Sequence, residues 1–254
     1  MVNNAARTPR VQLAGVAIGN GFVDPLRMTA GYADIIYNAG IISGEDYVVA
    51  QGYVRDATRA IESGDYVGAY HVWDAFLNGD TTEGGAWFTN VTGLTNYFNV
   101  AIDTPANFSY FVGWVTSPAV RAATGVGAHP YVDGNVAVEV ALVGDVMFSQ
   151  LPRVEGLLQA GLKVAIYNGA LDLICGAPLT ERYLPTLDWP GADAWRAQRR
   201  AIWHDAAGNV AGYARSALNL VQVVMRGAGH MAPYDRPEDS LDLISRFVEG
   251  RAFN

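Results

Sequence analysis

An apolar run that ends in a glycine loop and an aspartate occupies residues 163–172, KVAIYNGALD. Residues 163–167 lack the polar alternation of a half-exposed strand, which is typical of a parallel strand with helices on both faces of its sheet. Asn168-Gly169 ends the run, and Asp172 follows in the loop. Because α/β proteins place their sites at the carboxyl ends of such strands, we expect Asp172 at the functional edge of a sheet.

Two further apolar runs also end in loops that contain glycine. Residues 11–18 lead into Gly19-Asn20-Gly21, and residues 221–225 lead into Gly227-Ala228-Gly229. His230 comes directly after the second of these loops. The sequence therefore predicts an α/β fold with a mostly parallel sheet, flanked by helices, whose glycine loops share one edge.

Helical patterns lie between and after the strands. Pro152 can begin a helix that ends near Gly161, and Pro237 can begin another at the C-terminus. Helices are also expected over residues 46–61 and 66–77, and residues 203–220 are typical of a hairpin. We divide the chain into residues 1–28 with the first strand, a helical cap insertion over 29–144, and 145–254 with the later strands.

Composition restricts the partners of this chain. Its 254 residues are 50% apolar, which suffices for a sizeable core. The net charge of −8 disfavours nucleic acid and anionic membrane surfaces as partners. No apolar run approaches the roughly 20 residues that span a bilayer, and the polar start MVNNAARTPR shows no signal peptide.

Two features of the sequence point to different cellular compartments. Cys175 is the single cysteine, so no intrachain disulfide can form, and its simplest interpretation is a small buried hydrophobe. Two sequons, Asn90-Val91-Thr92 and Asn107-Phe108-Ser109, instead predict glycosylation in the secretory pathway, although motifs this short also arise by chance.

Asp172 and His230 have the order and placement of the last two members of a catalytic triad. In α/β-hydrolases the nucleophile comes first, then the acid, then the histidine, at the ends of late strands. The histidine takes the proton of the nucleophile, and the carboxylate fixes its tautomer. Two simpler interpretations stay open: Asp172 as a helix cap and His230 as a structural polar residue.

Three ordered motifs resemble serine carboxypeptidases. Residues 227–238, GAGHMAPYDRPE, resemble the segment around the family's catalytic histidine. Residues 167–175, YNGALDLIC, resemble the segment around its aspartate, and residues 17–25, AIGNGFVDP, resemble the loop after the strand that follows its nucleophile. Residues 91–97 and 180–182 extend the resemblance, which is closest to the vitellogenic-like carboxypeptidases and collinear over nearly the whole chain.

The resemblance implies the C-terminal part of an α/β-hydrolase that cleaves single residues from peptide C-termini. Asp172 would orient His230, which would act as general base and then as general acid. Ile174 and Cys175 match positions that line the substrate pocket, and Met231 matches a position in the pocket for the leaving residue. The family uses no metal or organic cofactor and enters the secretory pathway as glycoproteins of the lysosome, the vacuole or the extracellular space.

The nucleophile of the family is missing from this chain. It lies in G-E-S-x-G upstream of the glycine loop at residues 19–21, and no serine here stands in G-x-S-x-G. We therefore expect the chain alone to be inactive, with an N-terminal chain or segment supplying the serine and the oxyanion hole. The alternatives are a non-catalytic pseudoenzyme or peptide-binding module, and a carboxypeptidase-like acyltransferase.

Overall fold

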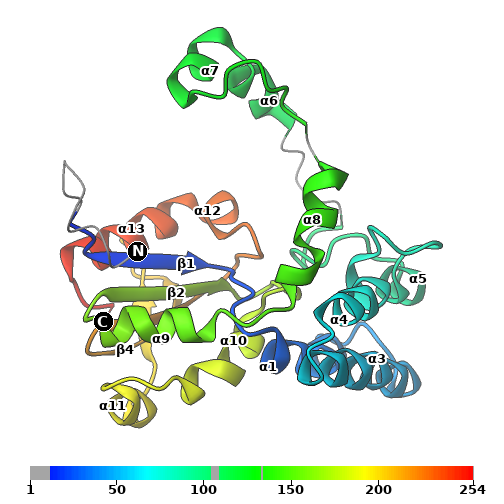
Figure 1. Ribbon diagram of the computed structural model, residues 1–254. Coiled ribbons are helices and arrows are strands. Elements are labelled where there is room, and N and C mark those ends of the chain that lie inside the picture. The colour runs from blue at the N-terminus through cyan, green and yellow to red at the C-terminus, as the bar shows by residue number, and fades with distance from the viewer. Residues whose placement is uncertain (1–11, 104–108, 133, 254) are drawn as a thin grey trace.

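Within the described residues, five strands form one mixed sheet (Figure 1), and their order is β1-β2-β5-β4-β3. The computed structural model describes residues 12–103, 109–132 and 134–253. The three predicted parallel strands are confirmed, and they are β1 (Gly15–Gly19), β2 (Lys163–Gly169) and β5 (Leu220–Met225). Two antiparallel strands, β4 (Val210–Ala217) and β3 (Ala201–His204), complete the sheet on the far side of β5.

The first strand differs from the prediction in its burial and in its boundaries: β1 was expected to be buried, but its residues are half-buried or exposed, because β1 is an outer strand of the described sheet. β1 begins at Gly15, whereas the sequence suggested residue 11, which lies outside the described residues. Gly15 pairs with Lys163, the first residue of β2, so the pairing starts where the partner strand starts. The predicted hairpin is confirmed, and its turn closes with a hydrogen bond from Asp205 N to Asn209 O of 2.9 Å.

Helices cover both faces of the sheet, as the apolar strands require. Val164 and Ile166 of β2 belong to the same cluster as residues of α9 (Leu151–Gln159) and α10 (Ala177–Tyr183). Val223 and Met225 of β5 belong to a second cluster, with Leu243 of α13 (Pro237–Glu249). The helices predicted from Pro152 and Pro237 are therefore confirmed.

Shorter helices follow β2 and β5. A 3-10 turn, Leu184–Thr186, and α11 (Ala192–Ala197) come after α10. The one-turn helix α12 (Ala232–Asp235) leads from the His230 loop into α13.

The cap begins directly after the β1 loop. The helix α1 (Pro25–Thr29) comes first and reaches the predicted boundary, and the cap then contains α2 (Tyr32–Asn38), α3 (Gly44–Glu62), α4 (Tyr66–Trp73) and α5 (Trp87–Thr92). Ser43 and Asp46 form a capping box that starts α3, close to the predicted start at residue 46. The helix predicted over 66–77 changes at Trp73 into a π-helical turn, Asp74–Asn78, which ends at Gly79 with φ of 80°.

The rest of the insertion extends away from the body of the molecule (Figure 1). It consists of a 3-10 turn, Ser109–Phe111, followed by α6 (Val112–Val115) and α7 (Pro118–Thr124). The helix α8 (Val136–Val146) returns to the body, where it contacts α4. No helix in the described ranges is both long and apolar enough to cross a bilayer.

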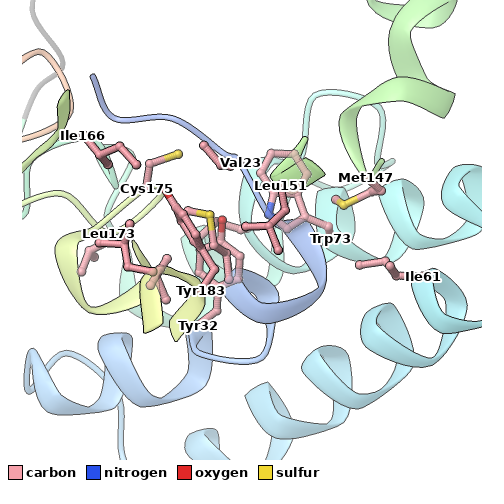
Figure 2. Packing of buried hydrophobic residues seen from close by; sticks show 14 of the residues in the cluster. Val23, Tyr32, Ile61, Trp73, Met147, Leu151, Ile166, Leu173, Cys175 and Tyr183 are labelled. Carbon is pink, nitrogen blue, oxygen red and sulfur yellow. The ribbon is translucent and has the colours of Figure 1, made fainter. Parts of the chain in front are cut away.

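One hydrophobic cluster joins the cap to the sheet (Figure 2). Tyr32 and Trp73 from the cap pack in the same cluster as Ile166 from β2 and as Leu173 and Cys175 from the loop that carries Asp172. The cap therefore packs directly against the segment that positions the aspartate. The division at residues 28/29 and 144/145 stays a prediction.

Glycine brings the two predicted catalytic loops into direct backbone contact. A Cβ atom on Gly169, at the end of β2, would lie 2.1 Å from the carbonyl oxygen of Gly229 and 2.4 Å from that of Ala228. Leu171 N donates to the same Ala228 carbonyl at 2.8 Å. A side chain at position 169 would force the aspartate and histidine loops apart.

We expect Gly169→Ala to destabilise the chain by about 2 kcal/mol, the order of cost for overpacking a closed site. Gly156→Ala is the matched control, because Gly156 lies inside α9 with no atom within 4 Å of its added Cβ. That substitution should stabilise by about 0.5–1 kcal/mol through helix propensity. Urea unfolding measures both variants, and equal stabilities would contradict the close approach of the loops.

Candidate active site

Asp172 is a buried carboxylate that accepts four hydrogen bonds. Its Oδ1 accepts from the backbone N–H groups of Ile174 at 2.9 Å and Cys175 at 3.0 Å. Its Oδ2 accepts from Asn20 Nδ2 at 3.0 Å and faces His230 Nδ1 at 3.0 Å. Only 1% of the residue is exposed, so these partners compensate the lost hydration of the carboxylate.

The helix-cap interpretation of Asp172 does not describe its position. The helix α10 begins at Ala177, and its N-cap residue is Gly176. The Oδ1 atom of Asp172 instead holds the two backbone N–H groups that follow it in its own loop. This turn fixes the carboxylate and leaves Oδ2 directed at His230.

His230 is fixed at both its backbone and its ring. Its backbone N–H donates to the Phe98 carbonyl at 2.6 Å, and its ring centroid lies 5.4 Å from that of Phe98. Since a carboxylate only accepts hydrogen bonds, contact with Asp172 places the proton on Nδ1 and leaves Nε2 of the neutral ring as the proton acceptor. The side chain is 24% exposed, which leaves the histidine accessible from outside the core.

Asn20 is a site residue whose role the sequence did not indicate. It adopts a left-handed backbone with φ of 48°, and its N–H donates to Tyr167 O at 2.8 Å. Its Nδ2 donates to Asp172 Oδ2 at 3.0 Å and contacts Gly229 O at 3.4 Å. Asn20 therefore connects the β1 loop to both other loops. An asparagine between two glycines after an apolar run was the signal available, because asparagine tolerates this conformation.

A short cap segment, residues 97–100, lies between the aspartate and histidine loops and was also missed. Leu173 N donates to Tyr97 O at 3.1 Å, and Val100 N donates to Leu171 O at 3.0 Å. The hydrogen bond from His230 to Phe98 is the third contact of this segment. We call residues 97–100 the cap strap.

The three predicted substrate-pocket residues differ in exposure. Cys175 is 5% exposed within the main core, and burial, followed by the nearby Asp172 charge, raises the pKa of its thiol. Ile174 is half-buried, and its carbonyl accepts from Tyr32 Oη at 2.7 Å. Met231 is 43% exposed beside His230. Their contacts with substrate stay a prediction.

Of the predicted glycosylation sites, Asn90 is exposed on α5, where its Nδ2 donates to Gly84 O at 3.2 Å. Asn107 lies outside the described residues. Glycosylation stays a prediction at both positions. Within the described part of the chain, no group of three or more His, Cys, Asp or Glu side chains is arranged to hold a metal ion.

The helix-flanked sheet, with an aspartate and a histidine meeting after β2 and β5, defines an α/β-hydrolase. A solved structure of Kex1(delta)p, described as a prohormone-processing carboxypeptidase from Saccharomyces cerevisiae, has the same fold. Its TM-score is 0.65 at 16% sequence identity, over 97% of this chain and 56% of that one.

The sequence comparisons identify the family. The family model for serine carboxypeptidases matches residues 1–250, and the chain belongs to that family. It is 38% identical over 253 residues to the mouse protein named probable serine carboxypeptidase CPVL, covering 98% of this chain and 52% of the mouse protein. It is 36% identical to the venom serine carboxypeptidase of Apis mellifera, over 96% and 52% of the two chains. The chain thus spans about half the length of the curated relatives it matches.

Two substitutions of Asn20 separate the hydrogen bond of its side chain from the conformational preference of its backbone. Asn20→Gly removes the hydrogen bond to Asp172 and keeps the left-handed backbone accessible, so we expect a loss of about 1 kcal/mol. Asn20→Ala should lose about 1 kcal/mol more, because a Cβ disfavours positive φ. Chemical denaturation measures both.

Leu218→Gly is the control for the backbone effect alone, since Leu218 has φ of 45° and is 74% exposed in the hairpin between β4 and β5. It should stabilise the chain. If Asn20→Gly stabilised the chain as much as Leu218→Gly does, the side chain of Asn20 would have no part in holding the aspartate.

Proposed function

We propose that this chain supplies the acid and the base of a serine-type carboxypeptidase that removes single residues from the C-termini of peptides. The observation that carries the proposal is the 3.0 Å contact of Asp172 Oδ2 with His230 Nδ1 in a member of this family. Nε2 of His230 takes the proton of the attacking hydroxyl and later gives it to the leaving amine. Asp172 holds the ring and stabilises its charged form during that exchange.

The nucleophile in this proposal comes from a further segment of polypeptide, N-terminal to the residues described. β1 is an outer strand of the described sheet, and no strand in the described ranges pairs with its free side. An unpaired parallel edge exposes backbone donors and acceptors, which favours the addition of a strand. A strand added there would end at the same edge as the β1 loop and could bring a serine and oxyanion donors toward His230.

The substrate in this proposal is a peptide with an apolar C-terminal region. Ile174, Cys175 and Met231 would contact it, and none of the three carries a charge that would select a charged residue. The exposed position of Asn90 and the family membership support passage through the secretory pathway to the lysosome, the vacuole or the extracellular space, with glycans at Asn90 and Asn107. Metal ions, organic cofactors, nucleic acid and membranes have no role in the proposal.

A non-catalytic peptide-binding module is the second candidate. It is supported by the hydrogen bonds that Asp172 accepts from Asn20, Ile174, Cys175 and His230, because these hold three loops together whether or not any reaction occurs. Such a module would retain Asp172 and His230 for their hydrogen bonds. The two candidates differ in what happens when the missing half of a relative is supplied.

The test joins the 254-residue chain to the unmatched half of the mouse relative and measures hydrolysis of a blocked dipeptide at acid pH. We expect no turnover by the chain alone and turnover by the completed protein. His230→Ala in the completed protein should lower kcat at least about 10⁴-fold, the scale of other triad knockouts. Val248→Ala, at an exposed position of α13, should leave activity unchanged.

Two results would refute the assignment. Turnover by the pure chain that disappears in His230→Ala would show that no further segment is needed. Full activity of the completed protein with alanine at position 230 would remove His230 from the mechanism. A folded, completed protein that binds the dipeptide without hydrolysing it would favour the peptide-binding module.

A further inference from the structure

The cap strap holds both loops of the Asp172–His230 pair at the same time. It accepts from Leu173 of the aspartate loop through the carbonyl of Tyr97, and from His230 through the carbonyl of Phe98. It also donates from Val100 to Leu171. The strap is therefore a backbone bridge between the two loops that is separate from the hydrogen bond between their side chains.

The strap is itself fixed by two buried asparagines. Asn96 Oδ1 accepts from the backbone N–H groups of Phe98 at 3.2 Å and Asn99 at 3.3 Å. Asn99 Nδ2 donates to Asp235 Oδ2 at 3.0 Å, and that same oxygen accepts from Gly229 N at 2.7 Å. One carboxylate oxygen thus ties the strap to the residue next to His230.

The strap meets the histidine loop without room for a side chain. A Cβ atom on Gly229 would lie 2.4 Å from the Phe98 carbonyl oxygen and 2.6 Å from the Cβ atom of Asn99. Because the two backbones touch here, a shift of the strap moves His230 as well.

The other end of the strap is anchored in the cap. Tyr97 Oη donates to Asn78 Oδ1, and Asn78 Nδ2 donates to Asp74 Oδ1 at 3.2 Å. Asp74 is fully buried, and its Oδ2 accepts from Thr81 and Thr82 hydroxyls at 2.7 and 2.6 Å. Burial opposes ionisation of this carboxyl, but the threonine hydrogen bonds prevail and lower its pKa. Burial, followed by the charges of Asp80 and Asp74, raises the pKa of Tyr97, which keeps its phenol a donor.

We propose that Tyr97 and Asn99 are positioning residues, through which the cap sets the separation of Asp172 and His230. Their side chains have different partners: Tyr97 bonds to the π-helical turn of the cap through Asn78, and Asn99 bonds to Asp235. Neither side chain hydrogen-bonds Asp172 or His230, so each acts on the pair through the backbone. The catalytic importance of this positioning rests on the proposed function. The effect of Tyr97 and Asn99 on the separation of Asp172 and His230 does not depend on that function.

The experiment observes the His230 Nδ1 proton by NMR in the full 254-residue chain labelled with ¹⁵N-histidine. A proton held between imidazole and carboxylate gives a downfield signal that exchanges slowly with water, and His230→Gln identifies it among the four histidines. We expect Tyr97→Phe and Asn99→Ala each to raise its exchange rate about fivefold or to abolish the signal, as follows from losing one hydrogen bond of ordinary strength.

Tyr70→Phe is the matched control. Tyr70 is also a buried cap tyrosine, and its hydroxyl donates to Glu139 Oε1 at 2.7 Å, away from the strap. We expect Tyr70→Phe and Tyr97→Phe to lower the thermal midpoint by similar amounts, while only Tyr97→Phe changes the His230 signal. An unchanged signal in both folded strap variants would overturn the inference, because the strap would then stabilise the cap alone.

The outcomes separate this inference from the proposed function. If the unmodified chain lacked the slowly exchanging proton, the pair itself would not be formed, and both would be contradicted. If the strap variants altered the signal while the completed protein remained inactive, the positioning role would stand and the proposed function would fall.

Discussion

The hydrogen bond between Asp172 and His230 sets the main constraint on this structure. A buried carboxylate must be compensated by donors, and here four donors from three loops provide this, one of them the imidazole of His230. Each donor comes from a different part of the fold or from the turn after Asp172 itself. The sheet places these loops at one edge, but their fine adjustment depends on contacts that the sheet does not supply.

Two of those contacts involve backbone alone. Gly169 lets the aspartate and histidine loops approach to a distance that any side chain would prevent, and the cap strap then spans them. The core that joins Tyr32 and Trp73 to Leu173 gives the cap a fixed position from which the strap can act. In this arrangement the cap contributes to holding Asp172 and His230 together.

Much of the sheet and half of the site could be predicted from the sequence. The three parallel strands and the meeting of Asp172 with His230 follow from apolar runs that end in glycine loops. Asn20 and the strap did not follow, because their importance comes from contacts between residues far apart in the chain. The π-helical turn after Trp73 was missed for a local reason: Asp74 continues the helical pattern of the sequence, and the pattern does not show that hydroxyl groups seven and eight residues later bond to its carboxylate.

A double-mutant cycle with Asp172→Asn and His230→Gln tests the central claim most directly. The free energies of unfolding of the two single variants and the double variant, measured by urea denaturation against the unmodified chain, give the coupling between the side chains. We predict a favourable coupling of about 1 kcal/mol or more, as is found for contacting polar pairs. A coupling near zero, with all four proteins folded, would mean that carboxylate and imidazole do not interact and would contradict this account of the site.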